Sequence, residues 1–583
     1  MIRKLFRQMM VTQIVSSMTV TLCMLIDSIM IGRFLGTDAM AAYGFTQPVL
    51  LAFAAPGAMI SAGVQVVCGK TMGGGDRDGT DACFTVSAAL TALIAALGLC
   101  VVLGFSGPIS TLLGAGRPSP NNPVFKLTKD YLIGFMLGVP AFLAAQIMVP
   151  YMQMSGSRKR LVAAVLLMTV SDVVFDFLNI LVFRGGTFGM GLASSLSYYA
   201  AVLVGIGYFF RKDCLFHIRP DGLRRGILRG ILAEGVPTLI NQLSLVLLVF
   251  LFNRILRAVS STQAVAAYSA VSTVSNLCYA FSSGISSVAL MLAAMFSTDE
   301  DRSSLYTLVK VMCHYAMKVL AAVTLVVLLA ATPLVGLFLD NAPAVKALAA
   351  RGLRMFSLCL VPCALNTGFK FYYQGIGRVR LMELISVLQN FVFPALAAVI
   401  LSPLIGTRGV WLAFLCGESA ALLFICLHVW HVNGRVSLNP EDFALLSPSF
   451  GAAPGECYEH SVHSLQEATA VSEGATAFCR NQGQDGRMSF LVGLCIEEIC
   501  CNIVRYGFQD GKKHSVNVRL VFREGSGMIR IRDNCAQFNP VHYIELHRHD
   551  DPTAHLGIRL VMAEAKNAVY LNSYGLNNLT LQL

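Results

Sequence analysis

The sequence is poor in charge. Only 13% of its 583 residues are Asp, Glu, Lys or Arg, whereas 55% are hydrophobic. Together with a mean hydropathy of +0.64, these values exclude one soluble domain and are typical of a chain that crosses a membrane repeatedly. The net charge of +11 is spread over segments between apolar runs. It therefore predicts an orientation in the membrane and no nucleic-acid surface.

Two familiar patterns are missing. The 17 cysteines are scattered, and no spacing of Cys and His is typical of a metal site, which indicates buried, reduced thiols. No small-residue cleavage site follows the first apolar run, and that run is too long for the core of a signal peptide. We therefore expect the first run to be a retained membrane span.

Apolar runs long enough to cross a bilayer as helices recur through most of the chain. They lie at about Met9–Leu35, Ala41–Cys68, Cys83–Phe105, Tyr131–Met154, Leu161–Phe183, Met190–Phe210, Leu232–Leu256, Ala264–Phe296, Val311–Leu339, Leu348–Tyr373, Leu381–Leu401 and Val410–Val432. The sequence thus predicts an all-α membrane protein with twelve transmembrane helices. More basic residues fall in the loops on the side of the N-terminus, which predicts that both termini are cytoplasmic at the inner (plasma) membrane.

Short motifs recur in the same order at an offset of about 220 residues. TDAMAAYG at Thr37–Gly44 returns as TQAVAAYS at Thr262–Ser269, and YMQMSG at Tyr151–Gly156 returns as YYQGIG at Tyr372–Gly377. This repeat predicts two pseudo-symmetric six-helix lobes, residues 1–215 and 216–435, with a cleft between them for alternating access.

Acidic residues interrupt two of the runs. Asp27 lies in the first run, and Asp172, Asp176 and Asn179 share one helix face in the fifth. A carboxylate in hydrocarbon costs at least about 2.5 kcal/mol, so it usually faces a bundle interior or a wet cavity. We expect these four residues to couple transport to H⁺ or Na⁺. Two alternatives remain: Asp27 could mark a helix end near the headgroups, and the stripe could join helices by hydrogen bonds.

The character of the chain changes after the last run. A linker rich in Pro, Gly and Ser is expected at 436–458, and a soluble α/β domain at 459–583. Helical spacing predicts helices at Leu465–Arg480 and Met488–Tyr506. Alternating hydrophobicity predicts strands at Ser515–Phe522, Met528–Ile531 and Asn578–Leu583.

The membrane part resembles the multidrug and toxic compound extrusion (MATE) family of cation-coupled exporters, over roughly residues 1–435. The stretches IDSIMIGRFLG, AMAAYGFTQP, DVVFDFLNILVFRGGTFGMGLASSLS and FYYQGIGRVR carry the resemblance. It implies a bilayer-embedded carrier of a small organic, often cationic, substrate, with an N-lobe cavity lined by acidic and polar residues. Asp27 and Asp176 match acidic positions of the family, and Asp172 falls where the family often has Asn.

The tail resembles the ATP-binding module of histidine kinases and anti-sigma-factor serine kinases, through EEICCNIVRYGF, IRDNCAQFNP and AHLGIRLV. The resemblance implies a cytoplasmic α/β sandwich that binds Mg-ATP. In it, Asn502 would hold Mg²⁺, Glu498 would act as general base, Asp533 would bind the adenine amino group and Gly557 would lie in the phosphate loop. Cys535 and His555 replace glycines of the family pattern, so a degenerate module without ATP is the alternative.

These observations favour an antiporter whose tail regulates transport in response to nucleotide. Two other functions remain open from the sequence. A flippase for lipid-linked precursors has a similar bundle, although its cavity should be more basic. A membrane-sensing serine kinase would instead use the tail to phosphorylate a separate regulator protein.

Overall fold

The computed structural model describes residues 2–73, 77–154, 158–209, 216–219, 223–298, 300–339, 342–447, 450–452, 455–509, 514–523, 526–547, 556–573 and 576–583. It divides into two compact units. The helical unit comprises residues 2–295 and 305–445. The tail unit comprises residues 446–583 together with residues 296–304, which come from the middle of the chain.

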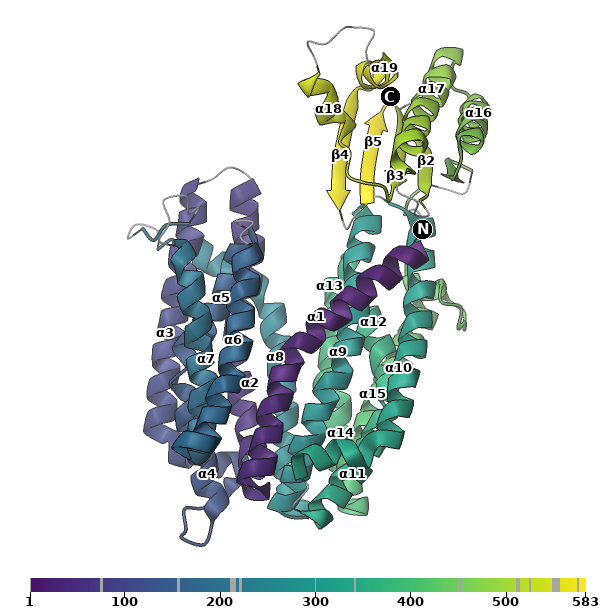
Figure 1. Ribbon diagram of the computed structural model, residues 1–583. Helices are drawn as coiled ribbons and strands as arrows, with labels where there is room; N and C mark the ends of the chain where they lie inside the picture. The colour runs from purple at the N-terminus through teal and green to yellow at the C-terminus, as the bar shows by residue number, and fades with distance from the viewer. Residues whose placement is uncertain are drawn as a thin grey trace. The chain divides into compact units, whose positions relative to one another are not determined.

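The helical unit is built of long helices joined by short connections (Figure 1). They are α1 (Ile2–Met30), α2 (Thr37–Gly73), α3 (Arg77–Ser110), α4 (Pro123–Met136), α5 (Val139–Met154), α6 (Arg158–Leu178), α7 (Gly186–Phe209), α8 (Arg225–Val259), α9 (Thr262–Thr298), α10 (Arg302–Leu339), α11 (Pro343–Ser357), α12 (Leu360–Gly375), α13 (Val379–Val387), α14 (Phe393–Ile405) and α15 (Thr407–Asn433), with the short turns η1 (Ile31–Leu35), η2 (Thr111–Ala115), η3 (Asn179–Phe183), η5 (Leu388–Val392) and η6 (Asp442–Ala444). Nine helices of the described chain are long and apolar enough to cross a membrane, or up to 11 if each of two bent pairs is one span. The count of twelve spans stays a prediction.

The two bent pairs occupy corresponding places in the two halves of the sequence. Helices α4 and α5 meet at 49°, and α11 and α12 also meet at 49°. Each pair begins with a proline in the first helical turn, Pro123 in α4 and Pro343 in α11, where the missing N–H of proline costs nothing. This shared geometry agrees with the internal repeat that the motifs predict.

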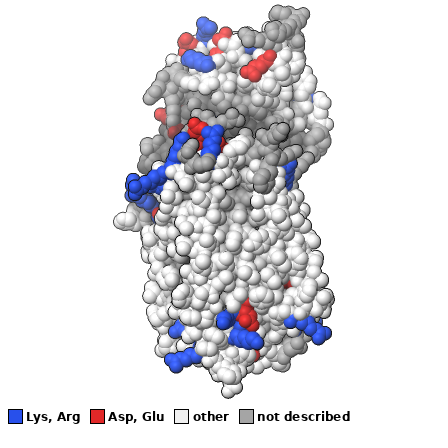
Figure 2. All heavy atoms as spheres, turned by 90° about the vertical axis from the view of Figure 1, so that its left-hand side faces the viewer, with Lys and Arg blue, Asp and Glu red and all other residues white. Residues whose placement is uncertain are grey.

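The outward faces of the helices are apolar. Helix α6, for example, exposes Leu166, Val170 and Val174, while its two aspartates are buried. Figure 2 shows one side of the helical unit with a broad band free of Lys, Arg, Asp and Glu, and charged residues near the ends of the helices. A helix such as α6 is polar on the face turned to the interior and apolar on the outward face, the arrangement that suits a lipid environment.

The tail unit is an antiparallel sheet with helices packed on it. Its strands, in the spatial order β1-β2-β3-β5-β4, are β1 (Cys457–Val462), β2 (Val516–Arg523), β3 (Ser526–Asp533), β4 (Asn567–Ser573) and β5 (Leu576–Gln582). The helices are α16 (Leu465–Asn481), α17 (Gly486–Asn502), the turn η7 (Ile503–Gly507), α18 (Pro540–Leu546) and α19 (Leu556–Glu564). The predicted helices and strands are confirmed, whereas β1, β4, α18 and α19 were not predicted.

The two faces of this sheet differ because side chains alternate along each strand. Val518 and Leu520 of β2 and Ile531 of β3 point into a core with α16, α17 and α19. The alternate positions are polar, and Arg519 of β2 pairs across the ladder with Arg530 of β3. The fold class expected from the sequence, a helical membrane bundle followed by an α/β domain, is confirmed.

Candidate functional site

Two aspartates of α6 lie in the interior of the helical unit. Asp172 is 7% exposed and Asp176 is fully buried, four residues further along the same helix face. The side chain of Asp27, half-buried in α1, interacts with both of them. The structure thus brings the three predicted carboxyl groups together, from helices that are far apart in the sequence.

The two carboxyl groups of α6 have few hydrogen-bond donors. Within the described part of the chain, Oδ1 of Asp172 and both carboxylate oxygens of Asp176 have no donor. A buried carboxylate without a donor or a counter-ion costs several kcal/mol. A proton on any one of the three groups would supply a hydrogen bond to a neighbour, and a bound cation would neutralise the charge. The role of the three carboxyl groups in ion coupling stays a prediction.

Asn179 takes part in a turn between α6 and α7. Its Nδ2 donates to the carbonyl of Gly186 at 3.1 Å, and its Oδ1 accepts from the backbone N–H of Gly185 at 3.1 Å. Gly189 packs so closely that a Cβ there would lie 1.7 Å from Asn179 Oδ1. Asn179 thus fixes the connection that follows the two aspartates, and its role in coupling stays a prediction.

A cavity of about 690 Å³ lies within the helical unit. Its lining includes Tyr43 and Gln47 of α2, Gln389 of η5 and Glu418 of α15. The three aspartates are not among the residues that line it. Tyr43 links the two places, because it lines the cavity and also lies near Asp27 and Ser28.

Glu418, on the C-lobe side of this cavity, belongs to a cluster of hydrogen-bonded polar side chains. Asn366 Nδ2 donates to Glu418 Oε2 at 2.8 Å, and Gln389 Nε2 donates to the same oxygen at 3.0 Å. Lys370 Nζ donates to Gln389 Oε1 at 3.4 Å. Asn366, Gln389 and Lys370 were not predicted from the sequence. The amide pair Gln389-Asn390 in an otherwise apolar run was a signal that could have revealed one of them.

In the tail unit, Asp533 ends β3 in a polar niche. Its Oδ1 accepts from the backbone N–H of Cys535 at 2.8 Å and from Asn577 Nδ2 at 2.9 Å. Asp533 is 5% exposed, and burial raises the pKa of its carboxyl group despite these two donors. A buried, ionisable acceptor at a strand end can bind a donor such as the amino group of adenine.

The other predicted nucleotide residues lie on α17 and α19. Glu498 and Asn502 are one turn apart near the end of α17, and both are half-buried. Gly557, in the first turn of α19, lies so close to α17 that a Cβ there would be 2.0 Å from Glu498 Oε2. The structure therefore brings Glu498 and Gly557 together.

The two departures from the glycine pattern have different outcomes. The side chain of Cys535 packs against Gly507, and a Cβ at Gly507 would lie 2.8 Å from the sulfur of Cys535. Gly507 thus gives the room that the thiol needs. His555 lies outside the described residues.

Comparison with known proteins identifies the helical unit. The model of the MatE family matches residues 13–178 and again residues 237–400, more than half of the chain. This chain belongs to the MatE family. The two matches to one model follow the two halves of the internal repeat. Residues 463–583 match the model of the histidine kinase-like ATPase domain.

Solved structures resemble this MatE chain in fold. An inward-facing multidrug resistance MATE family transporter of the MOP superfamily is 22% identical with a TM-score of 0.65, covering 69% of this chain and 92% of that one. An outward-facing one is 20% identical with a TM-score of 0.57, covering 73% and 94%. A MOP superfamily transporter from Pyrococcus furiosus, described as having a binding pocket of reverse polarity, gives the same values. A comparison with curated proteins gave no match.

The MatE chain thus combines a transporter fold with an ATPase-like domain. Its residues fit a nucleotide where they are described: Asp533 offers a buried acceptor, and Asn502 offers an amide oxygen of the kind that Mg²⁺ accepts. Bound Mg-ATP would supply a triphosphate and its metal ion. The roles of Glu498 as general base, Asn502 as magnesium ligand and Gly557 in phosphate binding stay predictions.

Proposed function

We propose that this MatE protein is a cation-coupled antiporter of the inner (plasma) membrane that exports small organic, often cationic, compounds by alternating access. H⁺ or Na⁺ would bind at the aspartates of α1 and α6 as substrate is released, and would leave to the cytoplasm before the next substrate binds. The tail, with both termini in the cytoplasm, would bind Mg-ATP and regulate this cycle. A separate regulator protein would be its target if the tail also transfers phosphate.

One observation carries the coupling role: Asp172 and Asp176 are buried next to Asp27, and three of their four carboxylate oxygens have no hydrogen-bond donor among the described residues. Amide side chains would suffice to join helices by hydrogen bonds. Carboxyl groups are needed only where a charge is taken up and given off, and clustered carboxyl groups titrate as a unit. The arrangement therefore favours coupling over helix packing.

The cavity supports a cationic substrate. It offers aromatic rings at Tyr43, Tyr268 and Tyr279, which attract cations, and the carboxyl group of Glu418. Its volume of about 690 Å³ lies in the range typical of sites for drug-sized ligands. A flippase for lipid-linked phosphates would instead need several basic groups at the cavity, and Lys370 is the nearest that this cluster provides.

The proposal predicts ion-driven transport that depends on Asp27. In everted membrane vesicles, an acidic interior should drive uptake of a fluorescent cationic dye if the coupling ion is H⁺, and a Na⁺ gradient should drive it if the ion is Na⁺. Asp27→Asn removes a titratable group and should reduce uptake to that of vesicles without the protein. Dye fluorescence after each gradient is imposed measures the initial rate.

Asp38→Asn is the matched control, because Asp38 is exposed in the first turn of α2. It should transport like the wild type. Equal uptake by Asp27→Asn and the wild type, or the absence of any gradient-driven uptake by the wild type for a panel of cationic dyes, would contradict the proposal.

A further inference from the structure

The polar face of the tail's sheet buries several arginines. Arg519 of β2 is 6% exposed, and Arg530 and Arg532 of β3 are 5% and 1% exposed. Guanidinium groups are seldom buried unless they are paired. Residues of the connection between α9 and α10, which belongs to the tail unit, contact each of the three.

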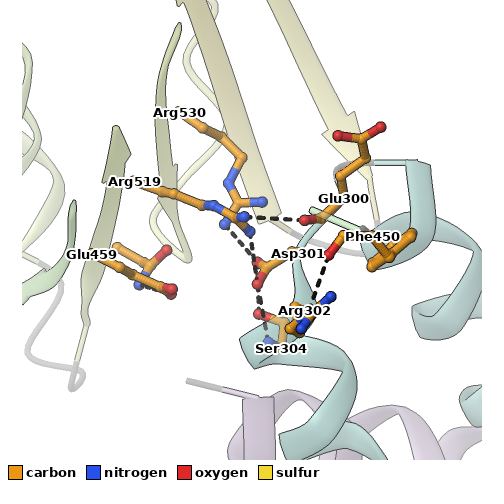
Figure 3. A network of polar contacts seen from close by, with 9 residues as sticks. Glu300, Asp301, Arg302, Ser304, Phe450, Glu459, Arg519 and Arg530 are labelled. Atoms are coloured by element: carbon orange, nitrogen blue, oxygen red, sulfur yellow. Dashed lines mark hydrogen bonds and ion pairs between the residues drawn. The ribbon is translucent and has the colours of Figure 1, made fainter. Parts of the chain in front are cut away.

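Asp301, in this connection, forms ion pairs with two of the arginines (Figure 3). Arg519 Nη1 lies 2.8 Å from Asp301 Oδ1, and Arg530 Nη2 lies 2.7 Å from Asp301 Oδ2. The carboxylate also accepts from the backbone N–H of Ser304 at 3.0 Å and from its hydroxyl at 2.7 Å. Asp301 is fully buried, and each of its oxygens pairs with one arginine and accepts one hydrogen bond from Ser304.

The neighbours of Asp301 strengthen the same contact. Glu300 has a φ of 49°, unusual for a residue with a side chain, and its carbonyl accepts from Arg519 Nη2 at 3.0 Å. Arg302 donates to the carbonyls of Phe450 at 3.0 Å and Ser447 at 2.7 Å. Phe296, at the end of α9, packs against the guanidinium of Arg532, 5.4 Å from its ring centre.

A close backbone approach completes the contact. Gly451 has a φ of +73°, and a Cβ there would lie 2.6 Å from the carbonyl of Glu300. A cap for the start of α10 would need only the bonds to Ser304. Two buried arginines, a strained residue and a close glycine go beyond what a cap requires, and they indicate a built interface.

We propose that the polar face of the tail's sheet is a docking surface for the α9–α10 connection, residues 296–298 and 300–304, and that the state of the tail reaches α9 and α10 through it. Both helices belong to the helical unit over most of their length, so the connection joins the sheet to the transporter in addition to the linker. The second half of the proposal rests on the nucleotide regulation proposed above. The docking itself does not.

The dependence of this contact on pH follows from its charges. Burial alone would raise the pKa of Asp301, but the facing Arg530 and Arg519 outweigh it and lower the pKa to about 2. The pKa of an Asp in an unfolded chain is about 3.9. The ion pairs of Asp301 therefore contribute stability above that pH and lose it as the pH falls towards 2. Glu459 and Cys457 of β1 also lie near Arg519. We expect hydrogen exchange in the connection to reveal no loss of the contact between about pH 8 and pH 5.

Hydrogen exchange on the full-length protein, followed by mass spectrometry, tests the docking. Asp301→Asn keeps a residue that caps helices well but removes the charge that holds both arginines. Amides of residues 300–304 should exchange about 100-fold faster than in the wild type, because a broken buried ion pair destabilises the local structure. Arg530→Gln should have the same effect from the other side.

Asp78→Asn is the matched control, since the Asp78–Arg219 ion pair is exposed on both sides. It should leave exchange in residues 300–304 unchanged. Unchanged exchange in both Asp301→Asn and Arg530→Gln would overturn the docking surface. If Asp301→Asn alone unfolds the tail, then Arg530→Gln, which leaves the cap of α10 intact, decides the question.

Dye transport in proteoliposomes, with and without Mg-ATP, tests the route to the helices. Mg-ATP should change the wild-type rate but not the rate of Asp301→Asn. A nucleotide effect that survives in Asp301→Asn, with exchange accelerated, would overturn the route. A wild-type rate indifferent to Mg-ATP would refute the regulation and the route together, while the exchange experiment still decides the docking.

Discussion

Replacing both Asp172 and Asp176 with Asn should abolish gradient-driven transport while leaving the protein as stable as the wild type or more so. Both side chains are buried, and three of their four oxygens have no donor among the described residues. Two neutral amides of nearly the same shape would remove the cost of holding charge there. We expect dye uptake at the level of vesicles without the protein, and a gain in stability of about 0.5–2 kcal/mol.

The pairing of lost function with retained stability is what separates coupling from packing. If the aspartates only joined helices, the double variant would transport normally or would unfold more easily. Thermal unfolding followed in detergent measures the stability, and everted vesicles measure the transport. Asp38→Asn serves again as the control for a change of charge alone, and gradient-driven uptake by the double variant would refute the coupling role.

Much of the helical unit could be predicted because lipid imposes a simple rule on length and polarity. The bends could not. The sequence predicts one span over Tyr131–Met154, but the structure begins α4 earlier, at Pro123, and bends at residues 137–138. Lys126 and Lys129 make the start of α4 too polar for an apolar run, and the break itself falls within continuous apolar sequence. A bend of this kind depends on packing against other helices.

The tail was predicted in part for a similar reason. Its central strands alternate clearly, whereas β4 has the sequence NAVYLNS and β1 the sequence CYEHSV, both short and partly polar. Such segments become strands because a neighbouring strand offers its hydrogen bonds, a condition that local sequence does not reveal.

The candidate sites also differ in how far the local sequence reveals them. Asp172 and Asp176 could be found because one helix spaces them, and their meeting with Asp27 was a reasonable expectation for acids in lipid. Asp301 could not, because in TDEDRSS it looks like one of several surface charges. Its partner Arg530 lies 229 positions further along the chain, and only the folded sheet brings the two together.

Asp533→Asn should weaken binding of Mg-ATP by about 10–100-fold, the cost of losing a hydrogen bond to a charged acceptor. Asp533 Oδ1 already accepts from Asn577 Nδ2 and from the N–H of Cys535. In Asp533→Asn, the amide oxygen would have to take the place of Oδ1, because an NH₂ group there would repel the N–H of Cys535 and the amide of Asn577. The NH₂ group of the Asn would then face the adenine amino group. Since both groups are donors, no hydrogen bond could form, and adenine recognition would fail.

The full-length protein in detergent, titrated with a fluorescent ATP analogue, measures this loss. Binding of GTP gives a second readout, since guanine has a carbonyl where adenine has its amino group. The wild type should prefer ATP, and Asp533→Asn should lose most of that preference, which general damage to the tail would not produce. Glu473→Gln, an exposed position on α16, is the matched control and should bind like the wild type. Equal ATP affinity in Asp533→Asn and the wild type would show that the acid at the end of β3 does not recognise the base, whereas a wild type that binds no ATP would mean that the tail acts without nucleotide.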